Sequence, residues 1–189
     1  LLLPGARPQV ELSEYKGLSK TLLLPGTSIR LESPSPSGRL TLVRSSEIPF
    51  RFAPGLSHTC NASLPEQLGL FVDGESWGAI TLSKMKHESQ GITDCLPSAA
   101  AYRLLDQPNI LCNRAGQGFG ILEGLEHEAR SIAGVQSHPG LVRLLRDQLG
   151  ADAAPVLARP EVQVHSGAVR SFLSRTDQGF DCIRLWTPG

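Results

Sequence analysis

The residues with the clearest chemical potential lie in one stretch, from Asn109 to Pro139, where a glycine turn joins an apolar strand to a helix. Gly116 and Gly118 follow the apolar run 109–113 within the hexapeptide AGQGFG. A glycine-rich turn in that place lets the backbone approach a nucleotide closely, beside the N-terminus of the next helix. The stretch therefore predicts the opening half of a nucleotide-binding α/β unit, although AGQGFG alone is a weak motif.

Other kinds of reactive site find little support in the chain. No GxSxG motif follows a predicted strand, so a serine hydrolase elbow is not indicated. The histidines, which are scattered and show no metal-ligand spacing with the acidic residues, are His58, His87, His127, His138 and His165. The sequence therefore predicts neither a Ser-His-Asp triad nor a metal centre.

The four cysteines fall into two pairs by context. Cys112 and Cys182 stand inside apolar strand candidates, which favours buried, inert thiols. Cys60 and Cys95 lie in loop-like stretches and are able to pair in an oxidising compartment, but the sequence alone does not fix a disulfide. The absence of CxxC and CxxCH argues against a zinc ribbon, a thioredoxin-like site and a c-type haem.

The elements that must position the glycine turn change character along the chain. In the front part, a short helix within 13–24 precedes alternating polar and apolar runs that predict strands at 28–32, 39–44, 68–72 and 77–82. Further on, the pattern predicts helices at 98–105, 119–127, 139–149 and 169–174, alternating with strands at 109–113, 131–136, 162–165 and from Phe180 to Trp186. Strands that alternate with helices indicate a parallel sheet.

We therefore predict an α/β protein with two parts. A small N-terminal antiparallel β region occupies residues 1–95, and a partial Rossmann-like parallel sheet with flanking helices occupies residues 96–189. Lys plus Arg and Asp plus Glu both number 18, and this neutrality argues against a nucleic-acid or anionic-lipid partner. No apolar run approaches the length of a membrane span. The chain begins with Leu1 rather than Met, which suggests processing or truncation and leaves a cytoplasmic or a membrane-associated location open.

The ordered set of short motifs resembles the polyamine aminopropyltransferases (spermidine synthase family), especially their membrane-linked relatives. The motifs that carry this resemblance are ELSEYKGLS, SGRLTLVRSSE, APGLSH, LFVDG, CLPSAAAYRLL, NILCNRAGQG, ILEGLEHEARSIAGVQSHP, VRSFLSRT and FDCIRL. The resemblance covers nearly the whole chain. It implies the class I S-adenosylmethionine-dependent methyltransferase fold, with a cofactor held by Gly116, Gly118 and the residue at the end of the second strand, Gln136.

Four positions depart from the family pattern where its chemistry is carried. Arg114 replaces the first glycine of the turn, and Gln136 replaces the acidic residue that binds the ribose hydroxyls. Ala168 replaces the Asp near the adenine, and Trp186 falls where the catalytic Asp would orient and deprotonate the amine. Asp181 matches an early Asp of the family that is usually structural.

These departures favour a spermidine-synthase-like scaffold or accessory subunit with no catalytic residue and no cofactor. Two alternatives remain. One is an aminopropyl- or methyltransferase that uses S-adenosylmethionine or its decarboxylated form and is completed by residues outside this chain. The other is a repurposed site in which Arg114 pairs with a phosphate. In either case the last strand, Phe180 to Trp186, leaves an open sheet edge, for which we expect a protein partner or a further C-terminal segment.

Overall fold

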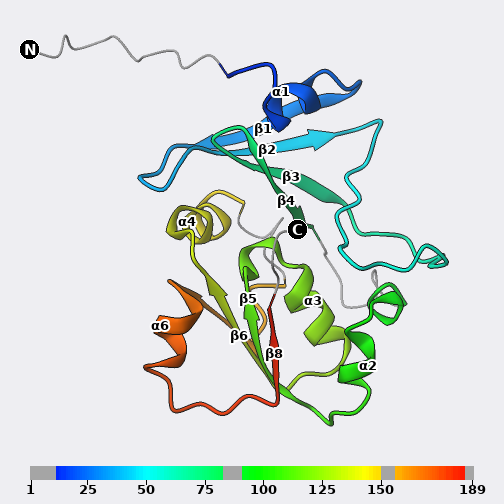
Figure 1. The fold of residues 1–189 in the computed structure, drawn as a ribbon, viewed down its shortest axis with the longest axis vertical. Coiled ribbons are helices and arrows are strands. Elements are labelled where there is room, and N and C mark those ends of the chain that lie inside the picture. The colour runs from blue at the N-terminus through cyan, green and yellow to red at the C-terminus, as the bar shows by residue number, and fades with distance from the viewer. Residues whose placement is uncertain (1–11, 83–90, 150–155, 186–189) are drawn as a thin grey trace, which may run out of the picture.

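The computed structural model describes residues 12–82, 91–149 and 156–185, which form two four-stranded sheets (Figure 1). The first sheet is antiparallel, in the order β1-β2-β3-β4, and the second is parallel, in the order β7-β6-β5-β8. Figure 1 shows the first sheet above the second, with α4 near the junction between them. The predicted α/β class, with an antiparallel region followed by a Rossmann-like sheet, is confirmed.

The first sheet is a meander of neighbouring strands preceded by one short helix. Its elements are α1 (Gly17–Leu22), β1 (Thr27–Ser33), β2 (Leu40–Ser45), β3 (Gln67–Val72) and β4 (Glu75–Thr81). The tight turn between β3 and β4 is Asp73-Gly74, with φ values of 49° and 81°. Two successive residues of positive φ form the hairpin turn that matches strand twist, and Asp-Gly is a favoured pair there.

The second sheet alternates with helices along the chain. Its elements are η1 (Thr93–Cys95), α2 (Ala99–Tyr102), β5 (Asn109–Asn113), η2 (Ala115–Gln117), α3 (Phe119–Glu126), β6 (Ser131–Gln136), α4 (Pro139–Asp147), β7 (Val162–Ser166), α6 (Val169–Leu173) and β8 (Cys182–Arg184). Strands β5 and β6 have the predicted bounds. The chain thus places its first parallel strand, β5, in the middle of the sheet, where the glycine turn follows it.

Alternate residues of β5 face opposite layers. Ile110 and Cys112 pack with α3, whereas Leu111 belongs to a smaller cluster beside α6. The first sheet also has two covered faces. Leu42 and Leu70 pack in the same cluster as the α4 leucines, and Val43 packs with Leu18 of α1 on the other face. Helix α4 therefore joins the two sheets. It lies in the chain between β6 and β7 of the second sheet, and its apolar stripe packs against the first.

The C-terminal part is shorter and more exposed than the sequence predicted. The strand expected from Phe180 to Trp186 comprises only β8, and Trp186 lies outside the described residues. Leu173, Ile183 and Leu185, apolar residues of the helix and strand predicted at 169–174 and 180–186, are 40%, 49% and 64% exposed. The reason is that α6 has five residues, none of them buried, and covers little of this face. The predicted helix over 98–105 likewise contracts to the four residues of α2.

No helix among the described residues has the length and hydropathy needed to cross a membrane.

Candidate functional site

The glycine turn after β5 is built from left-handed backbone at both of its ends. Arg114 has φ 53° and ψ 36°, and Gly118 has φ 77°. Between them, Ala115–Gln117 forms the 3-10 turn η2, and α3 begins at Phe119. Glycine adopts this conformation without cost, whereas an L residue such as Arg114 is strained by about 1 kcal/mol or more. The turn that the sequence predicted is therefore present, with its strain at Arg114.

The Arg114 side chain is held by the first sheet. Its guanidinium carbon lies 4.8 Å from the centre of the Trp77 ring, and Nη2 donates a 3.4 Å hydrogen bond to the Trp77 carbonyl. A guanidinium over an indole face is a favourable cation–π pair. Burial lowers the pKa of Arg114, yet an arginine remains charged at neutral pH.

Gln117 makes a second contact with the same strand. Its Nε2 donates a 2.5 Å hydrogen bond to the Trp77 carbonyl, so this one oxygen accepts from two residues of the glycine turn. Gly78 follows with φ 112°, and a methyl group added there would lie 2.9 Å from Gln117 Nε2 and 2.7 Å from the Phe52 ring. Strand β4 is thus fitted closely onto the turn.

The space beside Gly116 is filled by side chains of the same chain. A methyl group added at Gly116 would lie 2.8 Å from Leu141 Cδ2 and 3.0 Å from Gln136 Nε2. Gln136 ends β6 and is 1% exposed, and its Oε1 has no hydrogen-bond partner among the described residues. The structure therefore brings Gln136 and Gly116 together as the sequence predicted, with the amide packed against the glycine.

Gly118 has more room than Gly116. Its nearest neighbour for an added methyl group is the Thr81 carbonyl oxygen at 3.5 Å, so its positive φ rather than lack of space requires glycine. Glycine is therefore required at these two positions of the motif for different physical reasons. One accommodates α4 and β6, and the other provides the backbone turn into α3.

His138 caps the N-terminus of α4 and ties it to the first sheet. Its Nδ1 accepts a 3.3 Å hydrogen bond from the Leu141 N–H, so Nε2 carries the proton and donates to the Ser37 carbonyl at 3.1 Å. The ring also meets Trp77 edge-on, with centroids 5.5 Å apart. The contacts of His138 with Leu141, Ser37 and Trp77 thus have a structural role.

The ends of β7 and β8 carry no acidic cluster among the described residues. Ala168 is the N-cap residue of α6 and makes no side-chain capping bond. The Asp181 carboxylate accepts a 2.8 Å hydrogen bond from the Asn109 N–H and thereby ties β8 to β5, in keeping with the structural role expected of it. No group of three or more His, Cys, Asp or Glu side chains in 12–82, 91–149 and 156–185 is arranged to hold a metal.

A buried ion pair between α3 and β8 was not predicted from the sequence. Glu123 of α3 is fully buried, and Arg184 Nε of β8 lies 2.6 Å from its Oε2, close enough for an ion pair although not aligned as a hydrogen bond. The Ser98 hydroxyl donates to Oε1 of the same carboxylate. A signal existed, because Glu123 lies four residues after Phe119 and one after Leu122, on the apolar stripe of α3.

The groups around this ion pair are poor acids. Burial raises the pKa of the Cys112 thiol to about 12, with Arg184 opposing the shift and Glu123 adding to it. Burial also raises the pKa of Tyr102 and, more weakly, that of Cys182. Both thiols are therefore protonated at neutral pH. The prediction of a buried thiol is confirmed for Cys112 and is wrong for Cys182, which is only half-buried.

Comparison with known proteins supports the fold. No family model matches the sequence, and no curated protein matches it. Similar solved structures include a spermidine synthase in complex with the transition state analogue AdoDATO and a spermidine synthase from Thermotoga maritima. Each has a TM-score of 0.52 and 15% identity, over 82% of this chain and 45% or 46% of the other. The chain thus spans about half the length of these proteins and has a spermidine-synthase-like Rossmann-type fold.

Proposed function

We propose that this chain is a non-catalytic spermidine-synthase-like scaffold that serves as an accessory subunit of a larger assembly. The observation that carries the proposal is the filled space at the glycine turn. Leu141 and Gln136 pack against Gly116, where a bound nucleotide would need room for its own atoms. At Gly116 a close-lying nucleotide would meet side chains of α4 and β6, which supports a turn that holds no cofactor.

The charge at this place also disfavours the usual ligand. S-adenosylmethionine and its decarboxylated form carry a positive sulfonium, and Arg114 contributes a cation to the turn. Gln136 offers one neutral acceptor where a carboxylate would accept two charge-assisted hydrogen bonds from ribose hydroxyls. Both differences weaken binding in the same direction, which supports a function without a cofactor.

The proposal extends to the absence of transfer chemistry. A cationic amine needs carboxylates that orient it and accept its proton. The side chain available near the end of β8 is Arg184, which is committed to Glu123 in the interior. Trp186, the residue matched to the catalytic acid, has no carboxylate.

The partner surface that we propose is the open side of β8. In the described sheet β8 pairs with β5 along one edge, and its other edge is unpaired. Ile183 and Leu185 are about half exposed or more, and Leu173 of α6 adds apolar surface. Edge strands with exposed apolar side chains are normally covered. A protein partner, or a further segment of the same protein, would cover this edge.

Isothermal titration calorimetry with S-adenosylmethionine and decarboxylated S-adenosylmethionine tests the proposal directly. We expect no binding heat at ligand concentrations up to the millimolar range, with an active spermidine synthase as the positive control. Micromolar binding of either compound would contradict the proposal. The variant Leu141→Ala opens the space at Gly116, and Leu144→Ala removes the same number of atoms from α4 where it faces the first sheet. Weak binding by the first variant alone would identify packing as the cause of exclusion.

A second function has one observation in its favour. Gln136 Oε1 is a buried acceptor without a hydrogen-bond partner among the described residues, and a ribose hydroxyl would satisfy it. The alternative is therefore an aminopropyl- or methyltransferase that uses S-adenosylmethionine or its decarboxylated form and is completed by residues outside this chain. Turnover by a longer form of the protein, measured as thioether product by mass spectrometry, would favour it.

A further inference from the structure

The segment between β2 and β3 links two strands of the first sheet and packs against the second. In Figure 1 it leaves the first sheet and descends along the second towards α2 and α3. Ala53, Leu56 and Leu64 pack against the core of the second sheet, and Phe52 exchanges two hydrogen bonds with the Gln67 side chain. The segment is therefore fixed at both of its ends and along its length.

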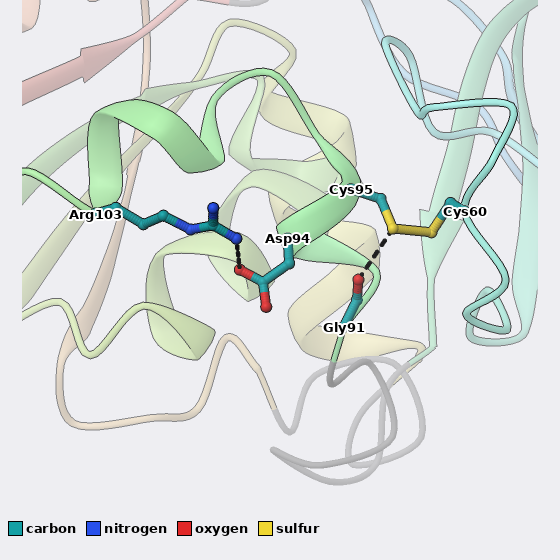
Figure 2. A network of polar contacts seen from close by, with 5 residues as sticks. All are labelled: Cys60, Gly91, Asp94, Cys95 and Arg103. Atoms are coloured by element: carbon teal, nitrogen blue, oxygen red, sulfur yellow. Dashed lines mark hydrogen bonds and ion pairs between the residues drawn. A yellow bond between two sulfur atoms is a disulfide. The ribbon is translucent and has the colours of Figure 1, made fainter.

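A disulfide joins this segment to the start of the Rossmann-like part. Cys60 is bonded to Cys95 in η1, with Cα atoms 5.7 Å apart (Figure 2). The Ser57 N–H donates a 3.2 Å hydrogen bond to the Cys95 carbonyl, which aligns the two backbones beside the bond. Cys95 Sγ also lies 3.2 Å from the Gly91 carbonyl oxygen. A reduced Cys95 thiol could donate a hydrogen bond to this oxygen, whereas the disulfide sulfur carries no proton.

The paired cysteines are more accessible than Cys112. Cys60 and Cys95 are half-buried in loop and turn positions, where a redox partner can reach them. Cys112 is 1% exposed, and burial raises its pKa, so it resists oxidation. Cys182 is half-buried as well, so the pairing of Cys60 with Cys95 follows from their proximity in the fold rather than from accessibility alone.

We infer that the Cys60–Cys95 disulfide is a permanent structural brace, and that this part of the protein matures in an oxidising compartment. The two thiols lose two protons and two electrons to the disulfide of a thiol–disulfide oxidoreductase, which is released as a dithiol. A reducing cytosol would reverse the reaction, because glutathione and thioredoxin systems keep thiols reduced there. This inference is independent of whether the glycine turn binds a cofactor.

The disulfide closes a loop that includes β4, the strand that packs against the glycine turn. The two cysteines are 35 residues apart, and the loop they close contains β3 and β4. Strand β4 carries Trp77, which contacts Arg114, Gln117 and His138. Closing this loop restricts the unfolded chain, so the disulfide favours the folded arrangement in which Trp77 meets the turn.

Acid-quenched thiol labelling of the full-length protein in its native cells tests the compartment. After unfolding, a polyethylene-glycol maleimide should add to two cysteines of residues 1–189, Cys112 and Cys182, and to all four after reduction. Four adducts before reduction would overturn the inference. A Cys60→Ser/Cys95→Ser double variant gives the reference band for two adducts. A peptide mass that joins Cys60 to Cys95 identifies the pair.

Limited proteolysis of the purified protein tests the brace itself. Reduction should increase the cleavage rate between residues 46 and 66 at least several-fold in the wild type. It should change nothing further in the double variant, which is already cleaved quickly. Cys182→Ser is the matched control, because it removes a cysteine and keeps the disulfide. Equal cleavage of the oxidised and reduced wild type would contradict the structural role.

Discussion

Replacing Arg184 with methionine should strongly destabilise the protein. The Glu123 side chain is 0% exposed and the Arg184 side chain 19%, so the variant leaves a carboxylate in the interior without its cation. Breaking a buried ion pair in this way costs about 3–5 kcal/mol. The Ser98 hydroxyl still donates to the carboxylate and compensates for about 1 kcal/mol. We therefore expect a loss of about 2–4 kcal/mol in the free energy of unfolding.

Removing both charges should restore most of that stability. In the double variant Glu123→Gln/Arg184→Met the interior holds a neutral amide beside an apolar side chain, and such replacements of buried pairs are often nearly neutral. Urea unfolding followed by circular dichroism gives the free energy for the single and double variants. With the Glu123→Gln single variant included, the wild type and the three variants form a double-mutant cycle, which isolates the interaction from the general effect of each substitution.

A surface ion pair provides the control for this experiment. Arg103 and Asp94 lie 3.2 Å apart, but their side chains are 65% and 53% exposed (Figure 2). Because solvent screens such a pair, Arg103→Met should change stability by no more than about 0.5 kcal/mol. If Arg184→Met costs no more than Arg103→Met, the pair does not stabilise β8 in the way the structure indicates.

Three further substitutions test other parts of the fold. Burial raises the pKa of Cys112 from 9.0 to about 12, so its buried neutral thiol contributes its full stability below pH 9. As the pH rises to 12 the unfolding free energy should fall by up to about 4 kcal/mol. In urea unfolding, Cys112→Ala should reduce this loss of stability at alkaline pH. Gly134→Ala would place a methyl group 2.5 Å from Ala115 Cβ and should cost about 1–3 kcal/mol, against almost nothing for Gly179→Ala, where no atom lies within 4 Å. His138→Ala removes the cap of α4 and should lower the unfolding free energy by about 1 kcal/mol or more, while an unchanged thermal midpoint would refute the capping role.

The elements of the parallel sheet could be predicted well because their signals are local. The runs that form β5 and β6 are short, apolar and bounded by polar residues, and their predicted bounds agree with the structure. The end of the chain gave a weaker signal. The apolar residues from Phe180 to Leu185 fit a core strand, but burial depends on what covers them, and α6 is too short to do so.

The candidate site could be predicted only in part, because a local sequence pattern does not show which distant elements pack against it. Gly116 and Gly118 were chosen from the glycine turn and Gln136 from the family resemblance, and the structure places Gln136 against Gly116. Trp77 was not identified, because it belongs to another sheet and lies 37 residues from Arg114 in sequence. A pattern of neighbouring residues cannot report a contact that the packing of two sheets creates.

Trp77 also explains how the chain tolerates an arginine in a glycine position. The left-handed backbone at Arg114 costs about 1 kcal/mol or more, and the contacts of its guanidinium with the Trp77 ring and carbonyl offset that cost. The same carbonyl accepts from Gln117, so the glycine turn and β4 hold each other in place. Restoring glycine at position 114 would relax the backbone and leave both the Gln117 contact and the packing at Gly116 intact. Arg114, Gln117 and Trp77 therefore act as one interlocked unit, which a substitution at position 114 alone would not take apart.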